Sequence, residues 1–497
     1  MDLSREDQLG NRLSTSQYTQ ESKVQPEKSG GESIMGRVEN PLEPATWHGS
    51  KKTFVAFVGL LTLFNSVFDS TIPSGGIRFI AAALNVQGES QLALPTSVFL
   101  IGYVTGPLVF GPMSEVYGRR VVMIGSFVLF TIFTLACAVA PSWLALIIFR
   151  SLCGIFASTP ITVTGGIFAD IYRSPLTRGR VMALSMAVTA AGPQFAPVIA
   201  GFVATAGWRW IFWVSLILAG VTLVPVLFLP ETFQPALVKQ PQRRGEGVVT
   251  KALARPLYML FCEPILSFTC LYLSYASAIF FMYFEAYPLI FQGVYGMSDG
   301  IAGLAFLPIA VGAGIGLGIF LAYDSFLQRA KSRRTSWSSI EEYQRLPLAC
   351  LGGPLYMVAL FWLGWSASPD IHWIVPMLAG IPFGMGFFLI FVALINYLID
   401  AYHEYAASAM AAASCCRSIL GAVLPLAAVP MFRQLGIAWG CGLLGFLSLL
   451  MSLIPFVFIR YGDKIRSRTC LGVLEIKLMS KSSFYMVYVT GARNFME

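Results

Sequence analysis

The sequence predicts an all-α membrane protein with twelve transmembrane helices in two groups of six. Its 497 residues are 56% hydrophobic and only 12% charged, whereas soluble domains carry about 25% charged residues. A soluble fold with so few charges could not cover its surface. The chain also contains apolar stretches whose lengths are close to the ~20 residues that a helix needs to cross the hydrocarbon core. A long polar connection separates the first six stretches from the rest.

The apolar stretches place the expected spans. In the first half they lie near residues 54–74, 92–112, 121–140, 143–168, 180–206 and 210–229, and in the second half near 268–292, 301–322, 347–366, 372–398, 406–432 and 436–459. The expected organisation is a disordered cytoplasmic N-terminal tail (1–53), an N-terminal six-helix bundle (54–229), a cytoplasmic central loop (230–267), a C-terminal six-helix bundle (268–459) and a cytoplasmic C-terminal tail (460–497). The N-terminal tail is polar and cannot bury enough apolar surface to fold.

Lysine and arginine set the orientation. If both termini face the cytoplasm, the inside connections hold fifteen basic residues: Arg119, Arg120, Arg173, Arg178, Arg180, Lys239, Arg243, Arg244, Lys251, Arg255, Arg329, Lys331, Arg333, Arg334 and Arg345. The outside connections hold only Arg78, Arg209 and Arg433. Basic residues near helix ends favour the cytoplasmic side, so both termini should be cytoplasmic. Orientation also explains the formal net charge of +8, and no nucleic-acid partner is expected.

The sequence does not indicate a metal, a cofactor or an enzyme. The nine cysteines show no CxxC pair and no metal-ligand spacing. The three histidines (His48, His372 and His403) fall in expected tails or loops. No Gly-x-x-x-x-Gly-Lys-Ser/Thr loop is present to hold the phosphates of ATP, so an ATP-driven pump is not expected.

The connection after the second span reads Gly111-Pro-Met-Ser-Glu-Val-Tyr-Gly-Arg-Arg120. It resembles the loop 2–3 motif of the major facilitator superfamily, which usually has Asp where this chain has Glu115. Gly118 would form the tight turn, while Arg119 and Arg120 would pair with acidic groups on neighbouring helix ends. Such a cluster can latch one state of an alternating cycle. Alternatively, the arginines are only positive-inside anchors.

Two further motifs carry the resemblance. The segment from Arg150 to Gly154 resembles the superfamily's arginine motif in the fourth span, which implies a role in proton coupling. A buried arginine costs about 2.5–3.5 kcal/mol on insertion scales and needs a partner or water, unless it snorkels to the surface. In span five, residues 191–201 resemble the drug:proton antiporter motif, with alanine at two expected glycine positions. Its helix-bending and packing residues would be Gly192, Pro193, Pro197 and Gly201.

The resemblance extends over roughly residues 50–466 and is strongest to the fungal twelve-span drug:proton antiporters, which include multidrug, polyamine and toxin exporters. Further segments that carry it are residues 165–170, 207–213, 229–233, 284–288, 303–308 and 396–400. The resemblance implies the major facilitator fold, with two six-helix bundles around a central substrate site. It also implies a monomer in the lipid bilayer, at the plasma membrane or the vacuolar membrane, whose partners are protons and a small-molecule substrate.

Ionisable residues within the spans are functional-site candidates because their burial has to be compensated. A carboxyl group in a low-dielectric cavity can load and release a proton near neutral pH. Asp69 and Glu285, together with Arg150, are therefore the candidates for proton coupling. Alternatively, the two carboxylates are partners of the arginines or lie in the extracellular mouth.

The other candidates form two groups. At cytoplasmic helix ends, acidic residues would serve as gate partners for Arg119, Arg120 and Arg178; these are Asp170, Glu231 and Asp400. Within the spans, polar and amphipathic side chains could line a substrate cavity: Asn65, Tyr103, Gln194, Tyr283, Tyr287, Asn396, Tyr397 and Arg417. Each of these could instead be an ordinary interhelical hydrogen bonder.

The expected function is export of a hydrophobic or cationic drug, toxin or secondary metabolite, driven by the inward proton gradient. One alternative is a proton symporter that imports a nutrient or polyamine, which would share the fold but should lack the span-five motif. Another is a transporter-like sensor that moves no solute.

Overall fold

The computed structural model describes residues 44–88, 91–233, 256–335, 340–402 and 405–466. The regular secondary structure of this described part is helical throughout. Most of both expected tails, and residues 234–255 of the expected central loop, lie outside the described residues. Just after that gap, residues 256–262 are helical.

The first six spans form the N-terminal bundle. A short 3₁₀ turn, η1 (Pro44–Thr46), precedes them, and the spans comprise α1 (Gly49–Thr71) with η2 (Ile72–Gly76) and α2 (Ile77–Ala83); α3 (Leu94–Gly102) with η4 (Gly106–Phe110) and α4 (Gly111–Tyr117); α5 (Arg119–Ala138); α6 (Trp143–Ala157) with α7 (Thr159–Ile171); α8 (Pro175–Val203) with η5 (Ala204–Ala206); and α9 (Arg209–Leu227). The first helix begins at Gly49, somewhat before the apolar stretch expected near 54–74.

The second six spans form the C-terminal bundle. They comprise α12 (Pro264–Tyr287) with η6 (Pro288–Val294); α13 (Asp299–Leu304) with α14 (Leu307–Ser332); α15 (Glu341–Ser366); α16 (Ile374–Leu378) with α17 (Gly380–Tyr402); and α18 (Ala406–Arg466). The 61 residues of α18 are two helices joined at Gly436, whose φ of 76° and ψ of 166° are not helical. The eleven long apolar helices of the described chain therefore make twelve spans, and the predicted fold class is confirmed.

Proline explains most of the breaks inside single spans. Because proline lacks an N–H group and clashes with the preceding turn, it ends or bends a helix. Pro160 lies in the first turn of α7, Pro288 begins the π-helical turn η6, and Pro308 lies in the first turn of α14. Spans four, seven and eight are thus continuous across the membrane but not straight.

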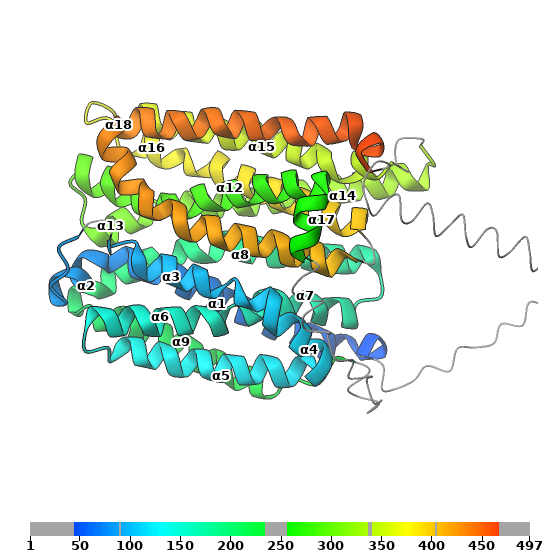
Figure 1. The fold of residues 1–497 in the computed structure, drawn as a ribbon, viewed down its shortest axis with the longest axis horizontal. Helices are drawn as coiled ribbons and strands as arrows, with labels where there is room; N and C mark the ends of the chain where they lie inside the picture. The colour runs from blue at the N-terminus through cyan, green and yellow to red at the C-terminus, as the bar shows by residue number, and fades with distance from the viewer. Residues whose placement is uncertain (1–43, 89–90, 234–255, 336–339, 403–404, 467–497) are drawn as a thin grey trace, which may run out of the picture. The chain divides into compact units, whose positions relative to one another are not determined.

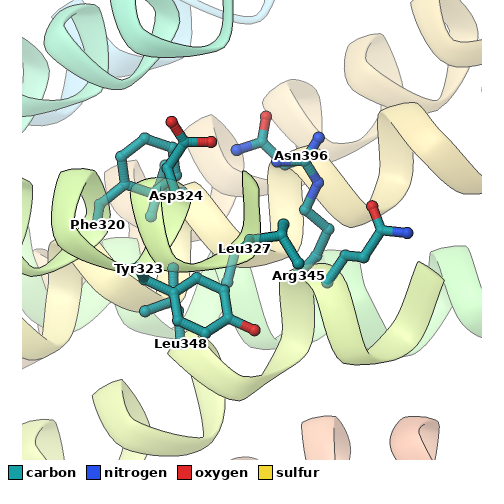
Figure 2. A pocket seen from close by; sticks show the side chains of 10 residues that line it. Phe320, Tyr323, Asp324, Leu327, Arg345, Leu348 and Asn396 are labelled. Atoms are coloured by element: carbon teal, nitrogen blue, oxygen red, sulfur yellow. The ribbon is translucent and has the colours of Figure 1, made fainter. Parts of the chain in front are cut away.

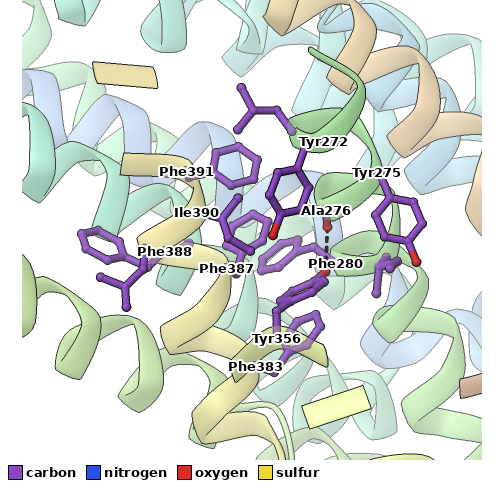
Figure 3. Close-up of a cluster of buried hydrophobic side chains, with 14 of the residues drawn as sticks. Tyr272, Tyr275, Ala276, Phe280, Tyr356, Phe383, Phe387, Phe388, Ile390 and Phe391 are labelled. Atoms are coloured by element: carbon purple, nitrogen blue, oxygen red, sulfur yellow. Dashed lines mark hydrogen bonds between the residues drawn. The ribbon is translucent and has the colours of Figure 1, made fainter. Parts of the chain in front are cut away.

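The helices of each bundle run side by side, and the described chain begins and ends at the same end of the helices (Figure 1). An even number of spans requires this, and it agrees with the expectation that both termini share one side of the membrane. The C-terminal bundle is held by stacked aromatic rings from α12, α15 and α17 (Figure 3). Phe280 stacks on Phe387 with ring centroids 4.4 Å apart, and Tyr356 stacks on Phe383 at 4.6 Å. In lipid such close packing, rather than exclusion of water, holds helices together.

Candidate functional site

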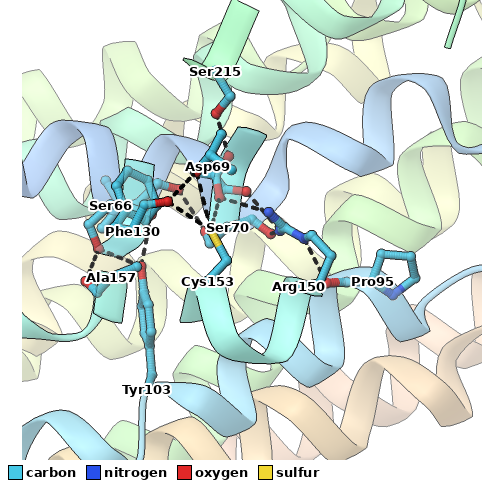
Figure 4. Close-up of polar contacts among 12 residues, drawn as sticks. Ser66, Asp69, Ser70, Pro95, Tyr103, Phe130, Arg150, Cys153, Ala157 and Ser215 are labelled. Carbon is cyan, nitrogen blue, oxygen red and sulfur yellow. Dashed lines mark hydrogen bonds and ion pairs between the residues drawn. The ribbon is translucent and has the colours of Figure 1, made fainter. Parts of the chain in front are cut away.

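A fully buried ion pair joins the first and fourth spans. Arg150 of α6 and Asp69 of α1 both have no solvent exposure, and Arg150 Nη1 lies 2.7 Å from Asp69 Oδ2. The guanidinium also donates to the backbone carbonyl oxygens of Asp69 at 2.8 Å, Ser70 at 3.3 Å and Pro95 at 3.3 Å (Figure 4). Because its donors are so well satisfied, this arginine neither snorkels nor faces open water.

The carboxylate of the pair is equally well held. Its Oδ1 accepts a hydrogen bond from Ser215 Oγ of α9, and the Cys153 thiol lies 3.5 Å from its Oδ2. Two aromatic rings flank the guanidinium, that of Phe99 at 4.3 Å and that of Phe212 at 6.0 Å. A buried ion pair with this many extra partners is closed to substrate in this conformation. This geometry matches the alternative in which Asp69 is the partner of an arginine.

Polar contacts continue from the pair towards the other bundle. Ser66, one turn before Ser70 on α1, places its Oγ 2.7 Å from the Tyr103 hydroxyl, which itself donates to the Ser66 carbonyl at 2.9 Å. The backbone carbonyl of the next residue, Val104, accepts a hydrogen bond from the Cys415 thiol of α18 at 3.7 Å. Tyr103 therefore sits where the second span meets the eleventh.

The loop between α4 and α5, which is expected to face the cytoplasm, is part of a compact charge cluster. Arg119 pairs with Asp170 of α7 at 3.4 Å and donates to Ser114 Oγ at 2.6 Å. Glu231 accepts hydrogen bonds from the backbone N–H groups of Arg119 at 2.9 Å and Arg120 at 3.1 Å. A carboxylate at a helix N-terminus satisfies free N–H groups and complements the helix dipole. Glu231 thus caps α5 instead of pairing with an arginine side chain.

Gly118 makes this cap possible. Its φ of 96° lies in the left-handed region, and a Cβ there would lie 2.5 Å from Glu231 Oε2. Gly111, the other glycine of the motif, begins α4 with open space around it. The side chains of Glu115, Arg120 and Arg178 are exposed. The structure therefore brings together Gly118, Arg119, Asp170 and Glu231, and leaves Arg178 outside the cluster.

A second group of charged residues, which includes Asp324 and Arg345, lies around a small pocket of the C-terminal bundle (Figure 2). Asp400 pairs with Arg345 at 2.7 Å, and not with Arg119, Arg120 or Arg178. Asp324 of α14 pairs with Arg180 of α8 at 3.2 Å, which links the two bundles. Asp324, Arg345 and Asn396 line a pocket of about 10 Å³ between these pairs, which is the space of about one water molecule.

The proline- and glycine-rich stretch of α8 packs on two partners at once. A Cβ at Gly192 would lie 2.6 Å from Val67 of α1, and one at Gly201 would lie 2.6 Å from the carbonyl oxygen of Asp299, at the start of α13. The carbonyl freed at Pro193 accepts a hydrogen bond from Thr71 at 2.8 Å. Small residues let helix backbones approach closely. The stretch therefore packs closely both on α1 of its own bundle and on α13 of the other bundle.

Comparisons with known proteins agree with this architecture. The profile of the Major Facilitator Superfamily matches residues 58–425. The chain belongs to the major facilitator superfamily. It is therefore a multi-pass membrane transporter for small molecules.

Its relatives include several fungal transporters. It is 34% identical to the efflux pump FUB11 of Gibberella moniliformis over 463 residues, which cover 88% of this chain and 77% of the relative. It is 33% identical to the multidrug transporter mdrA of Aspergillus fumigatus over 452 residues (86% and 74%). It is 35% identical to the citrinin biosynthesis cluster transporter mrr1 of Monascus ruber over 454 residues (86% and 89%).

Among solved structures, the proton:xylose symporter XylE bound to 6-bromo-6-deoxy-D-glucose has the same fold. The TM-score is 0.62 at 17% identity, with 83% of this chain and 97% of that chain covered. At this level of identity the likeness shows the fold alone.

Several residues expected to line the substrate cavity of this superfamily member point instead into single bundles. Asn65 donates to Thr222 at 2.7 Å inside the N-terminal bundle. Tyr283 stacks on Phe383 at 3.8 Å, and Tyr287 packs on Phe306 at 4.6 Å, both inside the C-terminal bundle. Tyr397 and Gln194 are also buried. In this conformation these residues pack helices together, as the alternative interpretation allowed.

Two predicted residues stand apart because they are half-buried and uncompensated. Glu285 of α12 and Arg417 of α18 lie within spans, and neither forms an ion pair with another described residue. Phe281, one turn before Glu285, packs on a buried cluster that contains Leu100 and Tyr103 of the N-terminal bundle and Ala422 of α18. Residues four apart share a helix face, so Glu285 lies on the side of α12 towards this cluster.

Sequence reasoning missed the pair of Arg180 and Asp324. Arg180 had been interpreted only as a positive-inside residue, and Asp324 falls just beyond the stretch expected near 301–322. A signal did exist, because each residue is a charge at the end of its span. Nothing in the sequence indicated that these two ends meet.

Proposed function

We propose that the chain is a proton-coupled antiporter that exports small hydrophobic or cationic organic compounds, such as drugs, toxins or fungal secondary metabolites, by alternating access. The names of its relatives support export, since they include an efflux pump and a multidrug transporter. The transporter mrr1 belongs to a biosynthesis cluster, which supports secondary metabolites as one substrate class. In this proposal the protein acts as a monomer in the plasma membrane and needs no cofactor.

The environment of Glu285 is the main observation that supports coupling of transport to protons. Its carboxyl is half-buried, lies on the side of α12 towards the cluster of Leu100, Tyr103 and Ala422, and has no cation beside it among the described residues. An isolated carboxyl within the membrane is stable as the neutral acid or with a cationic group bound to it. It can hold a proton or a cationic substrate, but not both. That exclusion is the requirement for antiport, because each ligand shifts the protein towards states that release the other.

The Asp69–Arg150 pair has a different role in this proposal. Since it joins α1 to α6 with no access to solvent, it stabilises the N-terminal bundle in this conformation. A proton that reaches Asp69 in another conformation would weaken the ion pair and let the first span move against the fourth. Arg119 and Asp170 would act similarly as a latch on the cytoplasmic loop.

The experiment is efflux of a fluorescent cationic dye from cells that express the chain, with and without a protonophore. The expected result is efflux that stops when the gradient collapses and is lost in Glu285→Gln but partly kept in Glu285→Asp. Efflux that persists with the protonophore would reject proton coupling. Dye uptake driven by an inward proton gradient would identify a symporter instead.

A further inference from the structure

Arg417 is a cation near the middle of the eleventh span. The groups around its guanidinium indicate which kind of substrate could bind there. Its guanidinium lies 3.4 Å from Ser414 Oγ and 5.8 Å from the centre of the Phe391 ring. Among the residues that the structure describes, no carboxylate pairs with it. The side chain is half-buried, so its charge is largely removed from water and only weakly compensated.

Comparison with Arg150 shows how unusual this environment is. Arg150 has a carboxylate at 2.7 Å and donates to three backbone carbonyls in the same bundle. Arg417 has one weak contact to a hydroxyl and the face of one ring. An unpaired charge within a membrane protein is unfavourable unless water or a ligand compensates it. The site is therefore prepared for an anion that the protein itself does not provide.

Both bundles contribute to the surroundings of Arg417. Phe391, whose ring lies beside the guanidinium, comes from α17 of the C-terminal bundle. The neighbouring Cys415 contacts the Val104 carbonyl at 3.7 Å. In transporters built from two bundles, the substrate binds near the midplane where the bundles meet. Arg417 lies at such a position, beside the aromatic ring of Phe391.

The chemistry of the group sets the class of ligand. A guanidinium presents a planar fork of donors that matches a carboxylate with two parallel hydrogen bonds. The aromatic ring of Phe391 beside it favours a flat, apolar ring on the ligand. We infer that Arg417 binds the carboxylate of an aromatic substrate between the two bundles. This inference rests on the proposed function and concerns its hydrophobic substrates: an aromatic acid binds at Arg417, whereas the exclusion of a proton at Glu285 applies to cationic substrates.

Glu285 does not block such an anion. Phe281 of α12 is the nearest neighbour of Gly421 on α18, which sets the register of these two parallel helices. Glu285 lies one turn to the extracellular side of that contact and Arg417 one turn to the cytoplasmic side. At 1.5 Å per residue the two charges are about 12 Å apart along the bundle. A carboxylate bound at Arg417 is therefore close to the cation and far from the acid.

The test uses one ring with three head groups: 2-naphthoate, 2-naphthamide and 2-naphthylmethylammonium. Binding to the purified full-length chain at pH 7 is measured by equilibrium dialysis. The wild type should bind the acid at least about tenfold more tightly than the amide. Arg417→Gln should weaken binding of the acid about ten- to hundredfold, as expected for loss of a charged hydrogen bond, and leave amide binding unchanged. Arg417→Lys should fall between the two.

Folding is checked through the melting temperature, which Arg417→Gln should not lower, because the substitution removes an unpaired charge. Equal binding of acid and amide by the wild type would overturn the inference, as would acid binding that survives Arg417→Gln. Preference for the ammonium compound would overturn it too, while leaving the proposed cation export intact. Failure of the proposed function is a separate result: reconstituted protein would then move none of the three compounds against a proton gradient.

Discussion

Removal of Arg150 should destabilise the protein far more than removal of Arg417. In Arg150→Gln the carboxylate of Asp69 stays buried with only Ser215 and Cys153 beside it, and three backbone carbonyls lose their donor. Breaking a buried pair by deleting one partner costs about 3–5 kcal/mol. Arg417→Gln deletes a charge with no carboxylate partner among the described residues, so its free energy of unfolding should stay within about 0.5 kcal/mol of the wild type.

The assay is unfolding of the purified protein in mixed detergent micelles, followed by helix content. The double variant Asp69→Asn with Arg150→Gln removes both charges and should recover most of the lost stability, since paired removal of buried charges is often neutral. The expected coupling energy between the two positions is about 3 kcal/mol. If Arg150→Gln unfolds like the wild type, or if the double variant is no more stable than Arg150→Gln, the assignment of a closed buried pair is wrong.

Three further predictions concern transport. Glu285→Gln should reach the cell surface at normal levels but lose efflux that depends on the proton gradient; unchanged efflux in a protonophore assay would remove the residue from coupling. Gly201→Leu should lower transport at least about tenfold, because a side chain there meets the backbone of Asp299 and forces the bundles apart; transport at the wild-type rate would show that this contact opens freely. Arg180→Asp and Asp324→Arg should each slow transport and restore it when combined, and failure of the combined variant to recover would argue against an ion pair between the bundles.

The span count and the main motifs could be predicted from the sequence because each depends on local information. Twenty apolar residues in a row identify a span wherever it packs, and the positive φ required at Gly118 is encoded by the glycine itself. The prediction that Arg150 needs a partner or water followed from its position within an apolar segment. Its pairing with Asp69 was one of the alternatives, and the structure selects it.

The direction of single side chains could not be predicted in the same way. A span that is apolar on all sides has no hydrophobic stripe to mark its inner face, so Tyr283 and Tyr287 could have faced either the substrate or the bundle core. Contacts between the two bundles could also not be predicted from the sequence. Arg180 and Asp324 are 144 residues apart in the chain, and their contact depends on how two complete bundles meet.

Proton movement during transport tests the central claim most directly. Purified protein is reconstituted into liposomes that contain a pH-sensitive dye and are loaded with a cationic substrate such as rhodamine 6G. Antiport predicts that the lumen acidifies as the substrate leaves, at a rate that falls to background in Glu285→Gln. Substrate that leaves with no change in luminal pH, or with protons moving in the same direction, would contradict the account.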